Sequence, residues 1–225
     1  MFDWSKIHTV LLDMDGTLLD LHFDNHFWLE HLPKRYAEHA QISRCEAADF
    51  LKSRYQQVEG TISWYCLDYW AEQINMPIRE LKQEVQHLIS LRADAHDFLI
   101  ALKQSGRKIV LVTNAHPDSL SLKIERTQLD KYFDELISTH QFGATKESQL
   151  LWQRLQQHVG FKNEHTLFVD DSISILDSAK TYGIKHLLAI ANPDSKQPIR
   201  EVTDYPAITD YSVLLNSIKS QPFVR

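Results

Sequence analysis

Two pairs of carboxylates stand directly after apolar segments of the chain. Asp13 and Asp15 lie in the run Asp-Met-Asp-Gly-Thr after one such segment, and Asp170 and Asp171 follow another. Carboxylates held this close together resist joint ionisation unless a cation or a proton separates their roles, and oxygen-rich clusters suit the hard ion Mg²⁺. Each pair therefore indicates a metal site or a division between acid and base, although turn geometry alone also favours Asp and Gly after a strand.

Two further polar sites occupy comparable positions. Thr113 and Asn114 follow an apolar run, and Pro117 then favours the start of a helix. A helix N-terminus binds phosphate through its unpaired N–H groups and positive dipole, although Thr-Asn is also a common helix cap. Lys146 opens a helical pattern, where the helix dipole disfavours a cation. This placement indicates a lysine that neutralises a phosphate or holds two carboxylates together, against the commoner alternative of a solvated surface lysine.

These polar groups need a scaffold that brings them together, and the apolar segments before them predict one. Short apolar segments bounded by turn residues are typical of buried parallel strands, and helical patterns lie between them. We expect strands at Thr9–Leu12, Lys108–Val112, Thr166–Val169 and His186–Ile190, a weaker strand at Glu135–Thr139, and helices at Asp118–Leu129 and Glu147–Val159. The pattern predicts an α/β fold with a doubly wound, Rossmann-like parallel sheet, which binds ligands at the carboxyl ends of its strands.

Residues 21–91 break this alternation of strands and helices. The segment contains only helix-like patterns rich in Trp, Tyr, His and Gln, and we expect at least four helices in it. Ser43 followed by Glu46 matches a capping box at one helix start. We therefore predict a core domain of residues 1–20 and 92–225 with an inserted helical cap domain of residues 21–91.

Length, charge and cysteine usage narrow the class of protein. The 225 residues are 43% hydrophobic, which is ample for a buried core, and the formal net charge of -6 without a dense Lys/Arg run argues against nucleic acid or an anionic membrane as the main partner. Cys45 and Cys66 have no second Cys/His cluster at ligand spacing, so neither a disulfide framework nor a zinc site is indicated, and a cytoplasmic location fits best. The first apolar run is too short for a signal or membrane segment. Of the twelve scattered histidines, His116 is the one to watch near the site.

Taken in order, the four polar sites resemble the motifs of the haloacid dehalogenase superfamily of hydrolases. The matching residues are Asp13-Met14-Asp15-Gly16-Thr17, Thr113-Asn114, Lys146 and Asp170-Asp171. The resemblance implies an aspartyl-phosphate mechanism with Asp13 as nucleophile, Asp15 as general acid and later base, and Lys146 as a further catalytic group. It also implies phosphate binding by Gly16, Thr113, Asn114 and Lys146, and Mg²⁺ binding by Asp13, Asp15, Asp170 and Asp171, with Asp15 using its main-chain carbonyl. An acid at position 15 favours phosphatases and phosphomutases over the dehalogenase, phosphonatase and ion-pump branches.

The cap has a narrower resemblance, to the bacterial GMP/IMP 5′-nucleotidases. It rests on residues 21–28 and 59–70. The resemblance implies a purine nucleoside monophosphate as the small-molecule substrate, and the candidate contacts are Asp20, Asn25, Trp64 and Asp68. Aromatic rings can stack on a purine while Asn25 or Asp68 bonds its edge. Any one aromatic residue is nevertheless more commonly part of the core of such a cap.

Several other functions stay open at this point. A sugar-phosphate phosphatase or a phosphomutase would use the same core and differ in its cap contacts. A sugar-nucleotide-dependent glycosyltransferase could use an Asp-x-Asp pair for metal and diphosphate, but this does not explain Lys146 and Asp170-Asp171 further along the chain. A non-catalytic nucleotide-binding module is a remote alternative, because the complete set of acids and lysine is present. The sequence indicates no oligomeric state.

Overall fold

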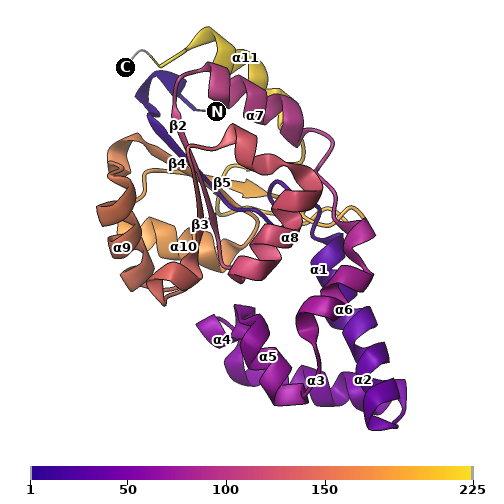
Figure 1. Cartoon of the computed structure of the whole chain (residues 1–225). Coiled ribbons are helices and arrows are strands. Elements are labelled where there is room, and N and C mark those ends of the chain that lie inside the picture. The colour runs from indigo at the N-terminus through magenta and orange to yellow at the C-terminus, as the bar shows by residue number, and fades with distance from the viewer. Residues whose placement is uncertain (1, 224–225) are drawn as a thin grey trace.

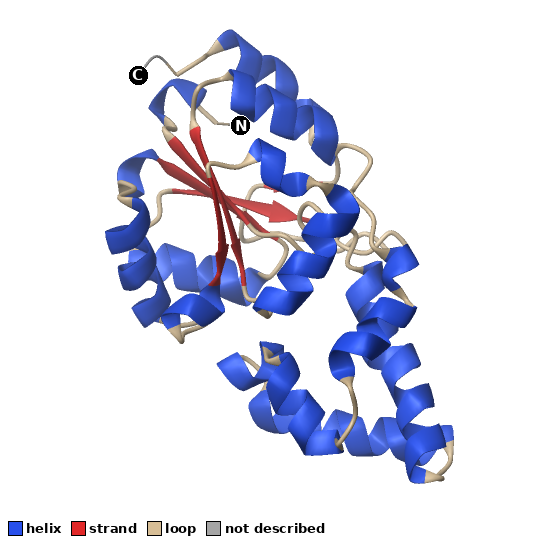
Figure 2. Cartoon of the chain, viewed as in Figure 1, coloured by secondary structure: helices blue, strands red, loops and turns tan. Residues whose placement is uncertain are grey.

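A six-stranded parallel sheet forms the centre of the larger part of the molecule (Figure 2). The computed structural model describes residues 2–223, and its strands lie in the order β3-β2-β1-β4-β5-β6. The strands are β1 (Thr9–Leu12), β2 (Lys108–Thr113), β3 (Glu135–Ser138), β4 (Thr166–Asp170), β5 (His186–Ile190) and β6 (Ala207–Ile208). The predicted fold class is confirmed, and the five predicted strands are present to within one residue at each end. The sequence pattern did not predict β6, since two residues are too few to show a period.

The register of the sheet brings two of the polar motifs side by side. β1 lies between β2 and β4, with Leu12 paired to Leu111 on one side and to Val169 on the other. The ladder continues one residue further, because the Asp13 N–H donates to Val169 O at 3.0 Å. Asp13 therefore lies beside Asp170 at the carboxyl edge of the sheet, where open parallel sheets bind ligands.

Helices cover both faces of the sheet (Figure 1). Successive strand residues point to opposite faces, so Val10 and Leu12 belong to the apolar cluster that contains Phe98, whereas Leu11 belongs to the cluster that contains Trp152. The helices of this part are α7 (Ala95–Gln104), α8 (Pro117–Thr127), α9 (Gln149–Val159), α10 (Ile173–Tyr182) and α11 (Ser212–Ser220). Relative to the predicted bounds, α8 ends two residues earlier and α9 begins two residues later.

The chain between the first two strands forms the helical cap. Its helices are α1 (His22–His26), α2 (Leu32–Ala40), α3 (Arg44–Val58), α4 (Ile62–Tyr65), α5 (Leu67–Ile74) and α6 (Ile78–Glu84), with a π-helical turn at Phe27–His31 between α1 and α2. The predicted capping box of Ser43 and Glu46 is confirmed at the start of α3. Trp70 is fully buried and makes edge contacts with Tyr55 and Trp64 and a tilted contact with Trp28, so these rings form the apolar centre of the cap. In the part of the chain that the structure describes, no helix has the length and apolar character needed to cross a bilayer.

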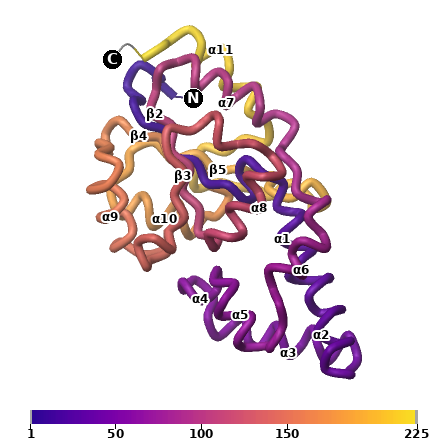
Figure 3. The backbone as a smooth tube through the Cα atoms, in the orientation of Figure 1, coloured from indigo at the N-terminus to yellow at the C-terminus, as the bar shows by residue number. Residues whose placement is uncertain are grey.

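Two neighbouring crossings join the cap to the sheet. The chain enters the cap after β1 and returns before α7 (Figure 3). Residues 18–20 and 90–92 lie side by side at this junction, where Leu19 and Leu91 form an antiparallel bridge flanked by backbone hydrogen bonds of 3.0 and 2.9 Å. The two crossings are therefore held together as one short ribbon.

Candidate active site

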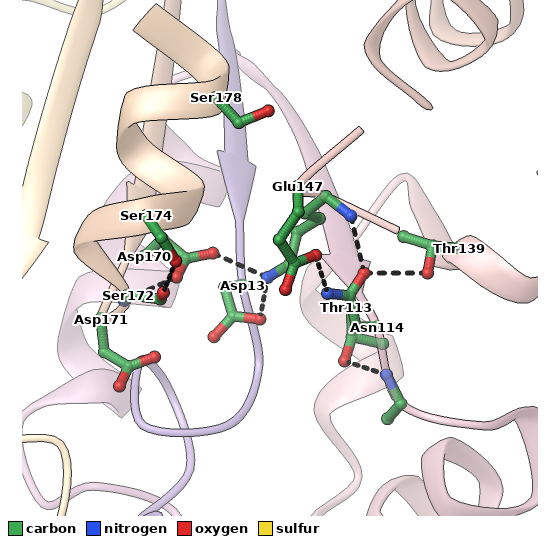
Figure 4. A network of polar contacts seen from close by, with 12 residues as sticks. Asp13, Thr113, Asn114, Thr139, Glu147, Asp170, Asp171, Ser172, Ser174 and Ser178 are labelled. Carbon is green, nitrogen blue, oxygen red and sulfur yellow. Dashed lines mark hydrogen bonds and ion pairs between the residues drawn. The ribbon is translucent and has the colours of Figure 1, made fainter. Parts of the chain in front are cut away.

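Three carboxylates and one ammonium group meet at the carboxyl edge of the sheet. Asp13 follows β1, Asp170 ends β4 and Asp171 comes next, and one carboxylate oxygen from each lies within 4.8 Å of the other two. Figure 4 shows these aspartates gathered between the end of β1 and the start of α10. The Lys146 ammonium lies 2.5 Å from Asp13 Oδ1 and 2.7 Å from Asp170 Oδ2, and all three of these residues are buried.

Lys146 and Arg200, whose guanidinium lies 3.3 Å from Asp171 Oδ2, supply two positive charges against three carboxylates. Burial raises the pKa of Asp13 and of Asp170 to about 6, although Lys146 acts in the opposite direction. Burial, with the charge of Asp13 added to it, raises the pKa of Asp171 to about 7. Asp13 Oδ2 is buried and has no hydrogen-bond partner among residues 2–223. An unpartnered carboxylate oxygen among like charges is favourable only with a cation beside it, so the cluster fits a hard divalent metal ion.

Gly16 leaves room for the Asp171 carboxylate. Its φ is 81°, in the left-handed region, and a Cβ at this position would lie 2.8 Å from Asp171 Cγ and 3.0 Å from Pro193 Cβ. The Gly16 N–H donates to Leu19 O at 2.8 Å. The phosphate contact predicted for Gly16 therefore lacks a free amide in this conformation, and the structure indicates that glycine is needed here for packing.

Asn114 holds the loop that carries Lys146. Its Oδ1 accepts hydrogen bonds from Thr139 Oγ1 at 3.0 Å and from the Lys146 N–H at 2.9 Å, and its Nδ2 donates to Glu147 Oε2 at 3.0 Å (Figure 4). These bonds use the side chain of Asn114 to hold the loop, and its phosphate contact stays a prediction. Thr113 differs, since its Oγ1 accepts a 3.0 Å bond from the N–H two residues later and keeps its own proton to donate.

Lys146 lies in the turn before α9, whereas the sequence pattern predicted that it opens the helix. Ser148 caps α9, and its Oγ accepts from the N–H of Leu150 at 3.3 Å. The buried Trp152 ring donates through Nε1 to Lys146 O at 3.0 Å. The lysine is therefore held from the backbone as well as through its ammonium, away from the dipole that would oppose its charge.

Asp15 belongs to a second buried network of charges, which includes two lysines that the sequence analysis missed. The Lys123 ammonium of α8 lies 2.7 Å from Asp15 Oδ1 and 2.6 Å from Asp24 Oδ2. Asp24, on α1 of the cap, also pairs with Lys82 of α6 at 3.0 Å. Both lysines are buried, and the Lys82 ammonium lies 4.5 Å from the centre of the Phe27 ring. The four charged groups sum to zero when all are ionised.

The charges of this network act on one another. Burial raises the pKa of Asp15 to about 6 although Lys123 opposes it, whereas Lys123 and Lys82 overcome burial at Asp24 and lower its pKa to about 2. One local signal for such a lysine is present in the sequence. Lys82 occupies a position of the apolar face of α6, which also presents Ile78 and Leu81 and is buried.

A cavity of about 310 Å³ lies between the acids of the core and the aromatic residues of the cap. The core side of the lining includes Asp13, Asp15 and Lys146, and the cap side includes Trp64 and Tyr65. The cavity is smaller than many sites for drug-sized ligands but lies within their usual range of about 300–1,000 Å³. An aromatic wall opposite a charged wall suits a ligand with one flat apolar end and one anionic end.

Two of the four predicted cap contacts line this cavity. Asn25 and Trp64 line it, and Asn25 Nδ2 also donates to Asp194 Oδ2 at 2.7 Å. Asp20 does not line it, because its Oδ1 accepts from two backbone N–H groups that shape the turn into α1. Asp68 does not line it either, because its carboxylate lies 2.5 Å from Arg79 on the surface of the cap. The structure therefore places these two residues outside the lining of the cavity, and their substrate contacts stay predictions.

The cap is docked onto the loop that carries Lys146. Tyr65 OH donates to Glu147 Oε1 at 2.8 Å, and Thr145 Oγ1 donates to Gly60 O at 3.1 Å. The Lys123 and Asp24 pair is a third link, since the lysine belongs to α8 and the aspartate to α1. The structure therefore shows the cap closed over the strand ends.

The fold and the site together define a hydrolase with a parallel-sheet core. Carboxylates at its strand ends and a buried lysine face a cavity closed by a helical cap. Residues 7–183 match the family model of haloacid dehalogenase-like hydrolases. The chain belongs to this family, and the resemblance seen in its motifs is confirmed.

Known relatives agree with this assignment. The chain is 44% identical over 215 residues to the GMP/IMP nucleotidase YrfG of Escherichia coli strain K12, which covers 96% of this chain and 97% of that protein. Its fold is similar to that of the HAD phosphatase from Thermococcus onnurineus, with a TM-score of 0.79, 22% identity and coverage of 96% of this chain and 100% of the other. It is also similar to that of the L-2-haloacid dehalogenase from Xanthobacter autotrophicus, with a TM-score of 0.64, 17% identity and coverage of 95% and 98%.

Proposed function

We propose that the protein is a magnesium-dependent phosphomonoesterase that hydrolyses purine 5′-nucleotides, GMP and IMP foremost, to nucleoside and phosphate. The observation that carries this proposal is the unpartnered Asp13 Oδ2, which lies next to Lys146 in the wall of a cavity that Trp64 closes from the cap. The 44% identity over 215 residues to a protein named as a GMP/IMP nucleotidase supports the choice of base.

Asp13 and Asp15 carry the two chemical steps of this mechanism. In the first step Asp13 Oδ2 forms a bond to phosphorus, the bond from phosphorus to the 5′ oxygen breaks, and Asp15 gives its proton to the leaving oxygen. In the second step Asp15 takes a proton from water as the water oxygen attacks phosphorus, and the bond to Asp13 breaks with release of phosphate. Burial supports the acid role, because an Asp15 pKa of about 6 keeps part of the population protonated near neutral pH.

The groups around Asp13 bind the charges of the phosphate. Lys146 and the Thr113 hydroxyl, which both line the cavity, would bind the oxygens that do not leave. Mg²⁺ would be held by the carboxylates of Asp13, Asp170 and Asp171 and by the main-chain carbonyl of Asp15. When bound, Mg²⁺ neutralises charge that develops on the transferred group.

Lys123 and Asp24 position Asp15 in this mechanism. The Lys123 ammonium lies 2.7 Å from Asp15 and is held from its other side by Asp24 at 2.6 Å. This geometry restricts the rotation of the Asp15 side chain, and a fixed donor is what proton transfer to a leaving oxygen requires. Asp24 belongs to α1, so the arrangement joins Asp15 to the part of the cap nearest the sheet.

The two parts of the chain divide the work of recognition. We assign phosphate chemistry to a core of residues 1–20 and 92–225 and the choice of leaving group to the cap of residues 21–91. The core groups would contact only the phosphate and the 5′ oxygen that all these substrates share, so any discrimination between them must come from the cap wall of the cavity. GMP and IMP share a 6-oxo group and a protonated N1, where AMP has an amino group and a bare N1, so a site built for the first pattern leaves polar groups unpaired with AMP.

A phosphate-release assay across GMP, IMP, AMP, CMP and a hexose phosphate tests the proposal. We expect the highest kcat/KM for GMP and IMP, complete loss of release in excess chelator, and recovery on addition of Mg²⁺. Better hydrolysis of the hexose phosphate would replace the nucleotidase by a sugar-phosphate phosphatase. Full activity in chelator would refute the metal assignment, and tight nucleotide binding without release would favour a binding module.

A further inference from the structure

A second cluster of metal-binding side chains lies where the cap meets the core. Cys66, His116 and His140 each offer one donor atom, and the three atoms lie within 4.8 Å of one another. Cys66 caps α5, His116 caps α8, and His140 lies in the short helical turn Thr139–Phe142. The sequence analysis predicted no Cys/His metal site, because these residues are far apart along the chain and only the fold brings them together.

His140 presents a free donor atom. Its Nε2 is buried and has no hydrogen-bond partner among the described residues. Burial, and next the nearby His116, lower the pKa of His140, so the ring stays neutral near pH 7 and keeps its lone pair. The backbone of Asn114 bonds to the same ring and orients it. A neutral imidazole oriented through its other nitrogen is the usual form of a metal-binding histidine.

His116 has a carboxylate on each side. Its Nε2 lies 3.4 Å from Asp68 Oδ2, and its Nδ1 lies 3.6 Å from Asp118 Oδ2. At present Nδ1 accepts a 3.2 Å bond from the Asp118 N–H. Metal binding through Nε2 places the ring proton on Nδ1, where the Asp118 carboxylate can accept it in exchange for that long bond. A carboxylate behind the ring raises the basicity of a metal-binding histidine.

Cys66 offers its sulfur at the start of a helix. It is a free cysteine at the N-cap of the eight-residue helix α5, and its Sγ accepts from the Tyr69 N–H at 3.5 Å. A helix N-terminus favours a negatively charged ligand atom placed there. The thiolate is the form of cysteine that binds metals.

We infer that Cys66, His116 and His140, with Asp68 as the fourth ligand, form a binding site for one thiophilic divalent cation such as Zn²⁺. One sulfur, two imidazole nitrogens and a carboxylate are a common tetrahedral zinc set. Bond lengths of about 2.0–2.3 Å place tetrahedral ligands about 3.5 Å apart. The donor atoms of Cys66, His116 and His140 lie within 4.8 Å of one another, so they need to close by about 1.3 Å at most, and Asp68 must turn from Arg79 to join them. The site differs in kind from the carboxylate cluster at Asp13, because Mg²⁺ prefers oxygen to sulfur.

The proposed ion joins the two parts of the molecule. Cys66 and Asp68 belong to the cap, whereas His116 and His140 belong to the loops at the strand ends. All four ligands come together only with the cap docked, so bound Zn²⁺ stabilises the closed form by its preference for that form. The concentration of available Zn²⁺ would therefore control how readily the cap opens.

Cobalt titration of the full-length, reduced protein tests the site. Excess Mg²⁺ is kept present to saturate the carboxylate cluster, and Co²⁺ replaces Zn²⁺ because its thiolate complex absorbs light. We expect one equivalent of Co²⁺ to produce a thiolate charge-transfer band in the wild type and in Cys45→Ser, which removes the other cysteine, exposed on α3. Cys66→Ser should lack the band. A wild type without the band, or a Cys66→Ser protein that keeps it, would overturn the proposal.

A second variant tests the site even if Cys66→Ser fails to fold. His140→Gln keeps the thiol and should bind Co²⁺ at least about tenfold more weakly, because even the loss of a group behind a ligand costs about 10- to 100-fold in affinity. Thermal unfolding with and without Zn²⁺ gives an independent readout, with a rise in Tm expected for the wild type and Cys45→Ser and a much smaller rise for His140→Gln. Equal affinity and an equal rise in Tm for His140→Gln would refute the site.

Discussion

The buried network around Asp24 has zero net charge when all four groups are ionised. Whether this neutrality stabilises the fold can be tested by removing one charge and then removing its opposite. Asp24→Asn keeps the shape of the side chain but leaves Lys82 and Lys123 with one partner fewer. Lys123 retains Asp15 at 2.7 Å, whereas Lys82 is left without a carboxylate among the described ion pairs. The double variant Asp24→Asn/Lys82→Met removes the uncompensated ammonium and returns the network to zero net charge.

The expected magnitudes follow from burial. Breaking a buried ion pair by removing one partner costs about 3–5 kcal/mol, since the other charge stays buried and unpaired. Lys82 keeps three aromatic rings within 5.2 Å, which offset part of this cost, so we expect about 3 kcal/mol of destabilisation for Asp24→Asn. A methionine of similar length in the same apolar surroundings should limit the loss in the double variant to about 1 kcal/mol.

Urea unfolding measures the difference. With a slope of about 2 kcal/mol/M, Asp24→Asn should lower the midpoint by about 1.5 M and the double variant by about 0.5 M. Glu38→Gln is the matched control, because it removes one of the two exposed partners of Arg35 and should change stability by less than about 1 kcal/mol. A double variant as unstable as Asp24→Asn would refute the reasoning, because the loss would then not come from an unpaired buried charge.

Three further predictions concern the reaction. Asp13→Asn should abolish phosphate release from both GMP and p-nitrophenyl phosphate. Asp15→Asn should retain part of its activity on the nitrophenyl ester, because that leaving group needs no proton. Equal loss on both esters for Asp15→Asn would contradict its acid role. Gly16→Ala should lower kcat/KM at least about tenfold, because its Cβ would meet Asp171 at 2.8 Å, and a wild-type rate with wild-type Mg²⁺ dependence would disprove this packing role. Trp64→Ala should lower kcat/KM for GMP by about 5- to 150-fold, the size of a stacking contact of about 1–3 kcal/mol, with little change for the nitrophenyl ester; an equal loss for both would show that Trp64 only supports the cap.

The parts of the site that could be predicted are those whose signals are local in sequence. Asp13 and Asp170 each follow an apolar segment with a strand pattern, and parallel strands place such positions at one edge. Lys146 could be singled out because a cation near a helix start needs an explanation. A local pattern of this kind identifies a residue and its edge of the sheet, but not which of its atoms are already bonded.

The parts that could not be predicted depend on contacts across the chain. Lys123 and Asp24 meet 99 residues apart, and no short pattern links them. Asp68 was expected to contact a purine, yet the rotation of α5 about its axis turns its carboxylate to Arg79. The rotation of a short helix in a cap is set by tertiary packing, here around Trp70, and a single sequence does not specify it.

The ribbon that joins the cap to the sheet can act as the hinge of the cap. Residues 18–20 and 90–92 are bonded to each other, so we expect the two crossings to bend together and the cap to swing about an axis close to α1. Points near a pivot travel little and points far from it travel far. Asp24 on α1 is therefore expected to stay near Asp15 through the cycle, while α4 and α5, farther from α1 in Figure 1, move through a longer arc. Substrate would then enter the cavity on the side lined by Trp64, where the cap moves farther from the core.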